Sequence, residues 1–182
     1  GDFTMRVERL ELDGPMLLYP NVHDDDRGYF SETLSLRDRT CTLPRFVQEN
    51  ESWTRRKGTL RGLHFQRGTS AQAKLVRCLT GAVRDVIVDI RAGSPTRFRW
   101  IAVELSAHDH TMLFIPKGFA HGFLTLTDDV LFQYKTDAYY DPASEGAVRW
   151  NDPTLAVAWG VEVPILSPKD AAAPFLEAAN LG

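Results

Sequence analysis

The feature that most constrains the fold is a close succession of short β-rich runs in the middle of the chain, with little helical periodicity between them. Residues 74–90 contain two such runs, separated at Thr80-Gly81, a dipeptide typical of a hairpin turn. Further runs of this kind occupy residues 99–105, 110–116 and 121–136, and the last is divided at Asp128-Asp129. Strands this short and closely spaced predict a sandwich or a barrel.

Helical patterns are confined to the periphery. One short helix is predicted at Leu34–Arg39, and another near the C-terminus, starting around Ser167 and interrupted by Pro174. No internal repeat or linker is visible, and 182 residues suffice for one compact domain with a real core. We therefore expect a mainly β fold, a double-stranded β-helix or jelly roll, over residues 5–182. Residues 1–4 precede Met5 and are expected to be a remnant of cloning.

Composition and charge exclude several classes of protein. The chain is 43% apolar and 25% charged, with a net charge of −3, which argues against a nucleic-acid coat or a membrane-surface protein. No apolar run approaches the length of a membrane span, and no signal-peptide pattern opens the chain. The two cysteines, Cys41 and Cys78, form neither a disulfide framework nor a zinc spacing. A reduced, cytoplasmic location is expected.

The segment LRGLHFQ, residues 60–66, contains the first candidate for chemistry. Strand alternation places Gly62, His64 and Gln66 on one face, opposite Leu63 and Phe65. A glycine beside an imidazole and an amide is more typical of a cavity wall than of a packed core. The alternative is a buried histidine that makes a single satisfied hydrogen bond.

The segment FIPKGFAHGF, residues 114–123, contains the second candidate. Its P-x-G-x-x-H spacing resembles the cupin superfamily, in which it aims a histidine, here His121, into a β-barrel. The alternative is a turn whose histidine faces solvent. Metal-dependent cupins add an H-x-H pair, but this chain has His64-Phe65-Gln66 at that place, and its His108-Asp109-His110 is predicted to form a turn. We therefore expect no metal site.

Carboxylates and phenols supply further candidates. Asp170 fits a capping box that starts at Ser167, and it could instead orient a histidine. Tyr134 shares a strand face with Phe132 and either packs there or donates a proton. Tyr139 and Tyr140 lie at a strand end, where a ring could stack on a flat ligand or pack.

Four cations lie near predicted strand or helix ends. Each is ordinary surface charge when taken alone, but together at one barrel mouth they would make an anion site. They are Arg27, Arg61, Lys74 and Lys169.

Taken together, ordered segments from about Val7 to Phe175 resemble the dTDP-4-dehydrorhamnose 3,5-epimerase family, a group of cupin-fold nucleotide-sugar epimerases. The matching segments are DDRGYFSE (25–32), FVQEN (46–50), LRGLHFQ (60–66), KLVRCLTGAVRDVIVDIR (74–91), IPKGFAHGFL (115–124), YKTDAYYDPASEGAVRWNDP (134–153) and LSPKD (166–170). The resemblance implies a cupin-type jelly roll with no cofactor. It also implies that the chain converts dTDP-4-dehydro-6-deoxy-D-glucose to dTDP-4-dehydro-L-rhamnose by inverting C3 and C5.

The resemblance also implies roles for single residues. His64 would be the general base with Asp170 holding its ring, Tyr134 the proton donor, and Lys74 the group that neutralises the enolate oxygen. Tyr140 would stack on the thymine. The implied substrate-binding residues are Arg27, Glu32, Gln48, Glu49, Asn50, Arg61, His121, Tyr140, Glu145, Trp159 and Lys169. Of these, Arg27 and Glu32 would reach in from the partner subunit of a homodimer.

Other functions stay open at this point. The nearest rival inverts a single centre, C3 or C5, of a related nucleotide-linked 4-keto-sugar, because the same residues would serve it. A ketoisomerase would move the carbonyl on the same scaffold. A non-catalytic jelly roll that only binds a sugar nucleotide and a metal-dependent cupin are the alternatives from other classes.

Three local features invite a structural test. Strict alternation places Arg61 opposite His64, so an irregularity is expected if both reach the same site. Many relatives have histidine at the position of Glu51, which suggests an altered group near the site. Arg97-Phe98 replaces the more usual Phe-Gly and is expected to reshape a turn.

Overall fold

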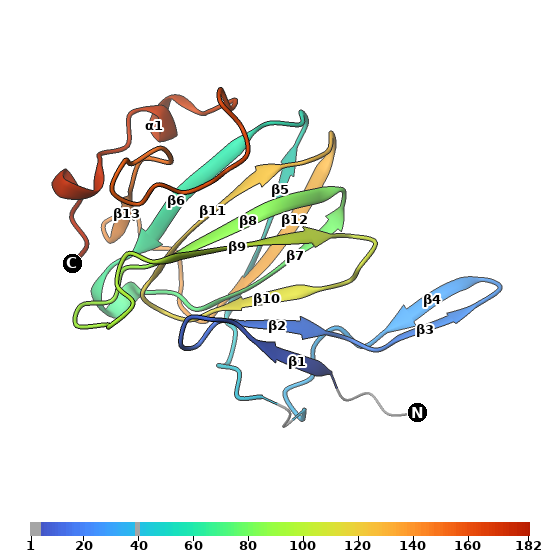
Figure 1. Ribbon diagram of the computed structural model, residues 1–182. Helices are drawn as coiled ribbons and strands as arrows, with labels where there is room; N and C mark the ends of the chain where they lie inside the picture. The colour runs from blue at the N-terminus through green and yellow to red at the C-terminus, as the bar shows by residue number, and fades with distance from the viewer. Residues whose placement is uncertain (1–4, 39–40) are drawn as a thin grey trace.

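The computed structural model describes residues 5–38 and 41–182 and consists mainly of two β-sheets that face each other (Figure 1). The six-stranded sheet has the order β1 (Arg6–Arg9), β2 (Met16–Tyr19), β10 (Met112–Ile115), β7 (Lys74–Thr80), β12 (Val130–Thr136) and β5 (Gln48–Thr54). The five-stranded sheet has the order β13 (Glu145–Ala147), β6 (Leu60–Gln66), β11 (Phe119–Thr125), β8 (Ala82–Asp89) and β9 (Trp100–Ser106). The pairs within both sheets are antiparallel. The predicted mainly β, cupin-type jelly roll is confirmed.

The strands agree with the β-rich runs of the sequence. The two runs within 74–90 are β7 and β8, and the residue between them, Gly81, has a φ of 75°, in the left-handed region that favours glycine. The later runs correspond to β9, β10, β11 and β12. The predicted turn around His108–His110 is also present, between β9 and β10.

A third, two-stranded unit stands apart from the sheets. It is the hairpin of β3 (Val22–Asp25) and β4 (Gly28–Ser31), which projects from one end of the molecule (Figure 1). Tyr29 and Phe30 on this hairpin are 61% and 65% exposed. An aromatic pair with this exposure is typical of a surface that meets another molecule.

The main core lies between the two large sheets. Alternation turns Val76 of β7, Ile87 of β8 and Phe132 of β12 inward, and all three are buried in one cluster. The same inward rows continue to Lys74 and Tyr134 at the next inward position of their strands. The polar interior of the molecule is therefore an extension of its apolar core.

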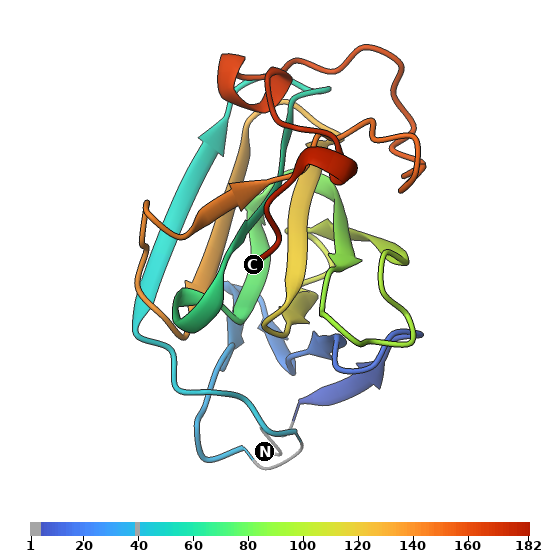
Figure 2. The same ribbon diagram turned by 90° about the vertical axis from the view of Figure 1, so that its left-hand side faces the viewer.

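The C-terminal segment covers the outer face of the five-stranded sheet (Figure 2). Its helix α1 (Pro168–Ala171) begins after Ser167, whose Oγ accepts a hydrogen bond of 3.1 Å from the Asp170 N–H. Pro174 separates this helix from a 3-10 turn at Leu176–Ala178. The predicted helix start and its interruption are confirmed, and the cap brings Asp170 beside β6.

The prediction of a helix at Leu34–Arg39 is wrong over residues 34–38, the part of it that the structure describes. Over residues 34–38 the chain makes only a turn, with a 3.1 Å hydrogen bond from the Asp38 N–H to the Ser35 carbonyl, and Arg39 lies outside the described residues. Leu34 packs with Leu43 on the outer face of the six-stranded sheet instead. So short a segment gains little from helix formation, and tertiary contact decides its conformation.

The turn at Arg97-Phe98 contains a left-handed residue. Phe98 has a φ of 71°, a left-handed conformation that is uncommon for a bulky residue. Its ring packs against the cluster on the outer face of the five-stranded sheet, and the Arg97 guanidinium lies 4.7 Å from the ring centroid. In the described part of the chain, no helix combines the length and the apolar character that a membrane span needs.

Candidate active site

An irregularity in β6 brings Arg61 and His64 to the same cavity. His64 pairs with His121 of β11, whereas Arg61 pairs with Phe123, so β6 has one extra residue in this interval. A Cβ on Gly62 would lie 2.5 Å from the Cα of Gly122. Gly62 therefore permits close approach of two backbones rather than forming part of a simple alternating cavity wall.

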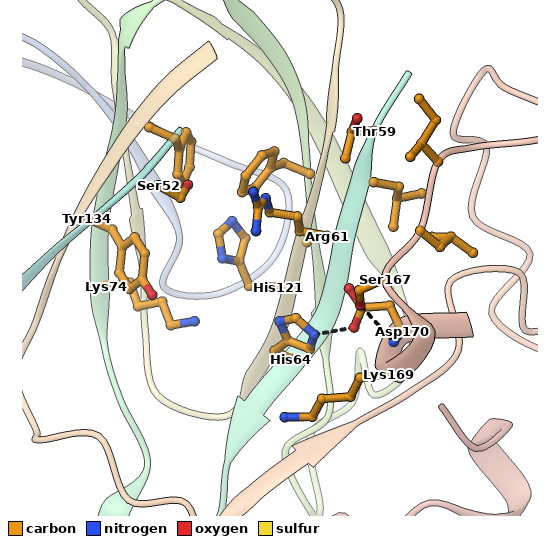
Figure 3. Close-up of a pocket in the computed structure, with 16 residues that line it drawn as sticks. Ser52, Thr59, Arg61, His64, Lys74, His121, Tyr134, Ser167, Lys169 and Asp170 are labelled. Carbon is orange, nitrogen blue, oxygen red and sulfur yellow. Dashed lines mark hydrogen bonds and ion pairs between the residues drawn. The ribbon is translucent and has the colours of Figure 1, made fainter. Parts of the chain in front are cut away.

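The cavity lies between the two large sheets and has a volume of about 410 Å³ (Figure 3). The predicted site residues that line it are Arg61, His64, Lys74, His121, Tyr134, Lys169 and Asp170. An adjoining pocket of about 90 Å³ shares His64, Lys74 and Tyr134 and adds Tyr140 and Glu145. The two spaces together hold most of the residues singled out from the sequence.

His64 is held by a carboxylate from the C-terminal helix. Its Nε2 lies 2.6 Å from Asp170 Oδ1, and Asp170 Oδ2 accepts a 3.3 Å hydrogen bond from the Gly62 N–H. Burial acts to raise the pKa of Asp170, but the hydrogen bond and charge of His64 and the bond from Gly62 outweigh it and lower that pKa. Asp170 is therefore an anion at neutral pH, which places the proton on His64 Nε2 and leaves Nδ1 as a proton acceptor.

Tyr134 lies on the other side of the cavity from His64, and Lys74 lies beside it (Figure 3). The Lys74 Nζ is 5.5 Å from the centroid of the Tyr134 ring. Burial lowers the pKa of Lys74 to about 8, although the negative charges of Asp85 and Glu145 act in the opposite direction. A lysine of this kind is still largely cationic at neutral pH and can meet a developing anion in the cavity.

A polar rim surrounds the adjoining pocket. Glu145 Oε2 accepts hydrogen bonds from the Tyr140 hydroxyl at 3.1 Å and from Lys169 Nζ at 2.9 Å. The Tyr140 N–H donates to Gln48 Oε1 at 3.0 Å, and Gln48 Nε2 donates to Asn50 Oδ1 at 3.0 Å. Tyr140 is exposed and fixed at both its backbone and its hydroxyl, which suits a ring that stacks on a planar ligand.

Alternation along β5 separates two residues from this site. Glu49 and Glu51 are exposed on the face opposite to Gln48 and Asn50. Glu49 accepts a hydrogen bond from Gln133 Nε2 and lies 3.8 Å from Lys135 Nζ, on the outside of the sheet. The interpretation of Glu51 as a changed group near the site is therefore wrong.

Three other predicted residues also lie outside the cavity. Arg27 is at the tip of the hairpin, where its side chain is 89% exposed and pairs with Asp25 at 2.5 Å. Glu32 follows β4 directly. Trp159 is only 3% exposed and donates from Nε1 to the Trp150 carbonyl at 2.8 Å, so it is part of the core under the C-terminal segment.

Two polar groups, one behind the cavity and one in its wall, were not predicted. Asp85 is 0% exposed, and its Oδ2 lies 2.7 Å from His121 Nε2. Ser52 lines the cavity with a buried Oγ that has no hydrogen-bond partner among the described residues. The segment VRDVIVD contained a signal for Asp85, because alternation assigns it to the same inward row as Val83 and Ile87.

His121 is turned inward, as the P-x-G-x-x-H spacing predicts, and is 7% exposed. Within residues 5–38 and 41–182, no three side chains of the types His, Cys, Asp and Glu come together as a metal site would require. The residues that gather here are suited to moving protons next to a stabilised anion.

Comparison with known proteins agrees with this geometry. A sequence model of the dTDP-4-dehydrorhamnose 3,5-epimerase family matches residues 9–178. A dTDP-4-dehydrorhamnose 3,5-epimerase from Escherichia coli is 50% identical over 170 residues, which cover 91% of each chain.

Two solved structures are similar over nearly their whole length. An epimerase of the same description from Bacillus anthracis, with TDP and PPi bound, has a TM-score of 0.92 and 43% identity and covers 95% of this chain and 100% of its own. A dTDP-6-deoxy-D-glucose-3,5-epimerase from Legionella pneumophila in complex with dTDP-4-keto-L-rhamnose has a TM-score of 0.90 and 42% identity, and covers 96% and 94%.

Proposed function

The chain belongs to the dTDP-4-dehydrorhamnose 3,5-epimerase family, and we propose that it inverts C3 and C5 of a dTDP-4-keto-6-deoxyhexose with His64 and Tyr134 on opposite sides of the sugar. The observation that carries the residue assignment is that both side chains and Lys74 line one cavity of about 410 Å³. The enzyme is an isomerase that needs no redox cofactor, because each inversion removes a proton and returns one.

The ketone at C4 makes this chemistry possible. It acidifies the C–H bonds at C3 and C5, because the electron pair left at either carbon delocalises onto the C4 oxygen as an enolate. The Nδ1 of His64 takes the proton, and Asp170 stabilises the imidazolium through Nε2, to which it lies 2.6 Å away. The C–H bond breaks and the new N–H bond forms in one step.

Lys74 and Tyr134 complete each inversion. The Lys74 ammonium stabilises the negative charge on the C4 oxygen, and it does so most strongly in a cavity from which water is excluded. The Tyr134 hydroxyl then donates its proton to the carbon from the opposite face, which inverts the centre and restores the ketone. Exchange with solvent returns His64 and Tyr134 to their starting protonation states.

The remaining residues hold the nucleotide. Arg61 at the cavity and Lys169 at its rim carry the charges that suit a diphosphate, and Tyr140 presents an exposed ring for the thymine. His121 would contact the sugar, and Gln48, Asn50 and Glu145 form the polar network beside Tyr140.

The working form would be a homodimer in the cytoplasm. Arg27 lies on a hairpin that projects from the sheets (Figure 1), and it is not among the residues that line the cavity of its own chain. A contact between Arg27 or Glu32 and the nucleotide would therefore come from a second copy. The exposed Tyr29 and Phe30 would bury apolar surface in that dimer.

Incubation with dTDP-4-keto-6-deoxyglucose in deuterated water tests the function. Deuterium at both C3 and C5 with formation of the L-rhamno product supports double inversion. Deuterium at one position supports a single-centre epimerase, a shifted carbonyl supports a ketoisomerase, and tight binding without exchange supports a sugar-nucleotide-binding protein.

Two variants test the residue roles. His64→Ala should abolish exchange at both carbons while nucleotide binding survives, because the nucleotide contacts lie elsewhere. Tyr134→Phe should still exchange protons but should form little inverted product. Near-full turnover by His64→Ala, or normal inversion by Tyr134→Phe, would contradict the corresponding role.

A further inference from the structure

Asp85 is a carboxylate in the centre of the apolar core. Its neighbours along the inward row of β8, Val83 and Ile87, belong to the main hydrophobic cluster. Asp85 Oδ2 lies 2.7 Å from His121 Nε2, but Oδ1 is buried and has no hydrogen-bond partner in the described part of the chain. Burying an incompletely paired carboxylate is strongly unfavourable, so stability alone does not account for this residue.

Asp89, four residues further along the same strand, is a buried carboxylate with a structural role and serves as a comparison. It is also 0% exposed, but both of its oxygens are used. Arg91 donates to them at 3.0 Å, Ser94 at 2.6 Å and Thr96 at 2.7 Å, which fixes the turn after β8. The contrast between Asp89 and Asp85 indicates that Asp85 serves something other than local structure.

Asp85 contacts a residue that lines the cavity, His121. His121 lies between Asp85 and the cavity, and it pairs with His64 across β11 and β6. The ring of Phe132 stacks on His121 with centroids 6.2 Å apart, which restricts the imidazole. Since Nε2 is held by Asp85, Nδ1 is the nitrogen that can accept a hydrogen bond from a sugar hydroxyl.

We propose that Asp85 is a positioning residue for the epimerisation: it holds His121 Nε2 at 2.7 Å and so fixes the imidazole with Nδ1 toward the sugar. The inference rests on the proposed function of this site. It adds a second histidine–carboxylate pair beside His64–Asp170, with a different task.

The charged and titratable groups around this unit are consistent with that task. Asp85 raises the pKa of Lys74 against the larger effect of burial, and Glu145 acts in the same direction. Burial lowers the pKa of His121, Asp85 acts against that, and Lys74 and His64 add to it. Cys78 also lies near Asp85, but burial raises the pKa of this thiol to about 12, so it stays neutral. Burial also raises the pKa of Asp85 itself, although the charge and hydrogen bond of His121 and the charge of Lys74 act to lower it.

Two substitutions test the proposal. Asp85→Asn keeps the shape and an oxygen that can accept the His121 Nε2–H. The variant should therefore keep kcat/KM within about tenfold of the wild type. KM at pH 7 should change less than about twofold, because the orientation of His121 is retained.

Asp85→Leu has nearly the same shape but removes both the charge and the acceptor. It leaves the buried His121 Nε2–H without a partner and should lose about 10²-fold or more in kcat/KM, whereas Asp85→Asn retains the acceptor. Asp89→Leu is the matched control on the same strand: it should lower the melting temperature and leave kcat/KM of the folded protein unchanged. A structural role for Asp85 predicts the Asp89 pattern for both residues.

A direct measurement on His121 does not depend on turnover. The 15N chemical shifts of its imidazole report which nitrogen carries the proton, and Asp85→Leu should change that tautomer while Asp85→Asn should keep it. An unchanged tautomer in Asp85→Leu, or a kcat/KM of Asp85→Leu equal to that of the wild type, overturns the proposal. If the wild type exchanges no substrate protons, the proposed function fails, and the 15N shifts still decide whether Asp85 fixes His121.

Discussion

Replacing Lys74 by methionine should make the protein more stable and nearly inactive. Burial lowers the pKa of Lys74 from its ordinary 10.5 to about 8. At about 1.4 kcal/mol for each pKa unit, the folded state is disfavoured by about 3 kcal/mol while this lysine carries its charge. Methionine has a similar length and no charge, so Lys74→Met should recover up to about 3 kcal/mol at pH 7.

The gain should depend on pH in a defined way. Above the folded pKa of about 8 and below the unfolded value of 10.5, the unfolded wild type binds a proton that the folded wild type has lost. Wild-type stability therefore rises with pH through this window, and the methionine variant lacks that rise. The difference between the two proteins should be full below about pH 8 and should vanish near pH 10.5.

Urea unfolding followed by tryptophan fluorescence at several pH values measures this difference, because all other titrating groups are common to both proteins. Solvent exchange at C3 and C5 should fall by about 10²- to 10³-fold in the same variant, as when one stabiliser of an oxyanion is removed. A variant less stable than the wild type at pH 7, or a stability difference that stays constant up to pH 10.5, would refute the argument.

Three further predictions follow from the geometry. Asp170→Asn should lower kcat by at least about 10²-fold with little effect on dTDP affinity, because the His64 tautomer loses its anionic partner; steady-state kinetics and calorimetry measure the two effects, and equal losses in both would count against it. Mixing Arg27→Ala dimers with His64→Ala dimers, each poorly active alone, should restore activity in hybrid dimers, since one site then holds His64 and the partner's Arg27 together. No recovery after verified subunit exchange would show that Arg27 does not act across the interface. Glu51→His should leave kcat/KM within about twofold, because Glu51 is exposed on the outer face of β5; a larger change would mean that the outer face affects the site.

The sequence predicted the strands and several inward-facing residues because both follow from a period of two. His121 and Tyr134 line the cavity where alternation and the P-x-G-x-x-H spacing put them. The same rule explains why Glu49 lies outside: its neighbours Gln48 and Asn50 occupy the other face of β5. A role that is assigned to a residue from its place in a family motif must therefore also agree with the face of the strand on which that residue lies.

Other features depend on contacts that no local pattern contains. Asp170 reaches His64 across 106 positions of sequence, and its local reading as part of a helix cap is also correct, because its backbone N–H is bonded to Ser167 while its carboxylate is bonded to His64. Arg61 enters the cavity through a bulge whose exact place depends on the pairing with β11. In the segment 34–38, contact with the sheet overrode a weak helical tendency.

Single strands in the interior of this protein combine apolar residues that stabilise the fold with polar residues that lower its stability and serve the reaction. On β7 the inward row changes from the buried Cys78 and Val76 to Lys74, and on β12 it changes from Phe132 to Tyr134. The apolar part of each row fixes the polar end, since a side chain anchored in a packed core has few other orientations. The desolvation that makes Lys74 costly to fold would also strengthen its proposed action on an enolate, because a charge in a dry cavity interacts more strongly than one in water. Substitutions that make these rows apolar should therefore stabilise the fold in proportion to the electrostatic stabilisation that they remove from the reaction.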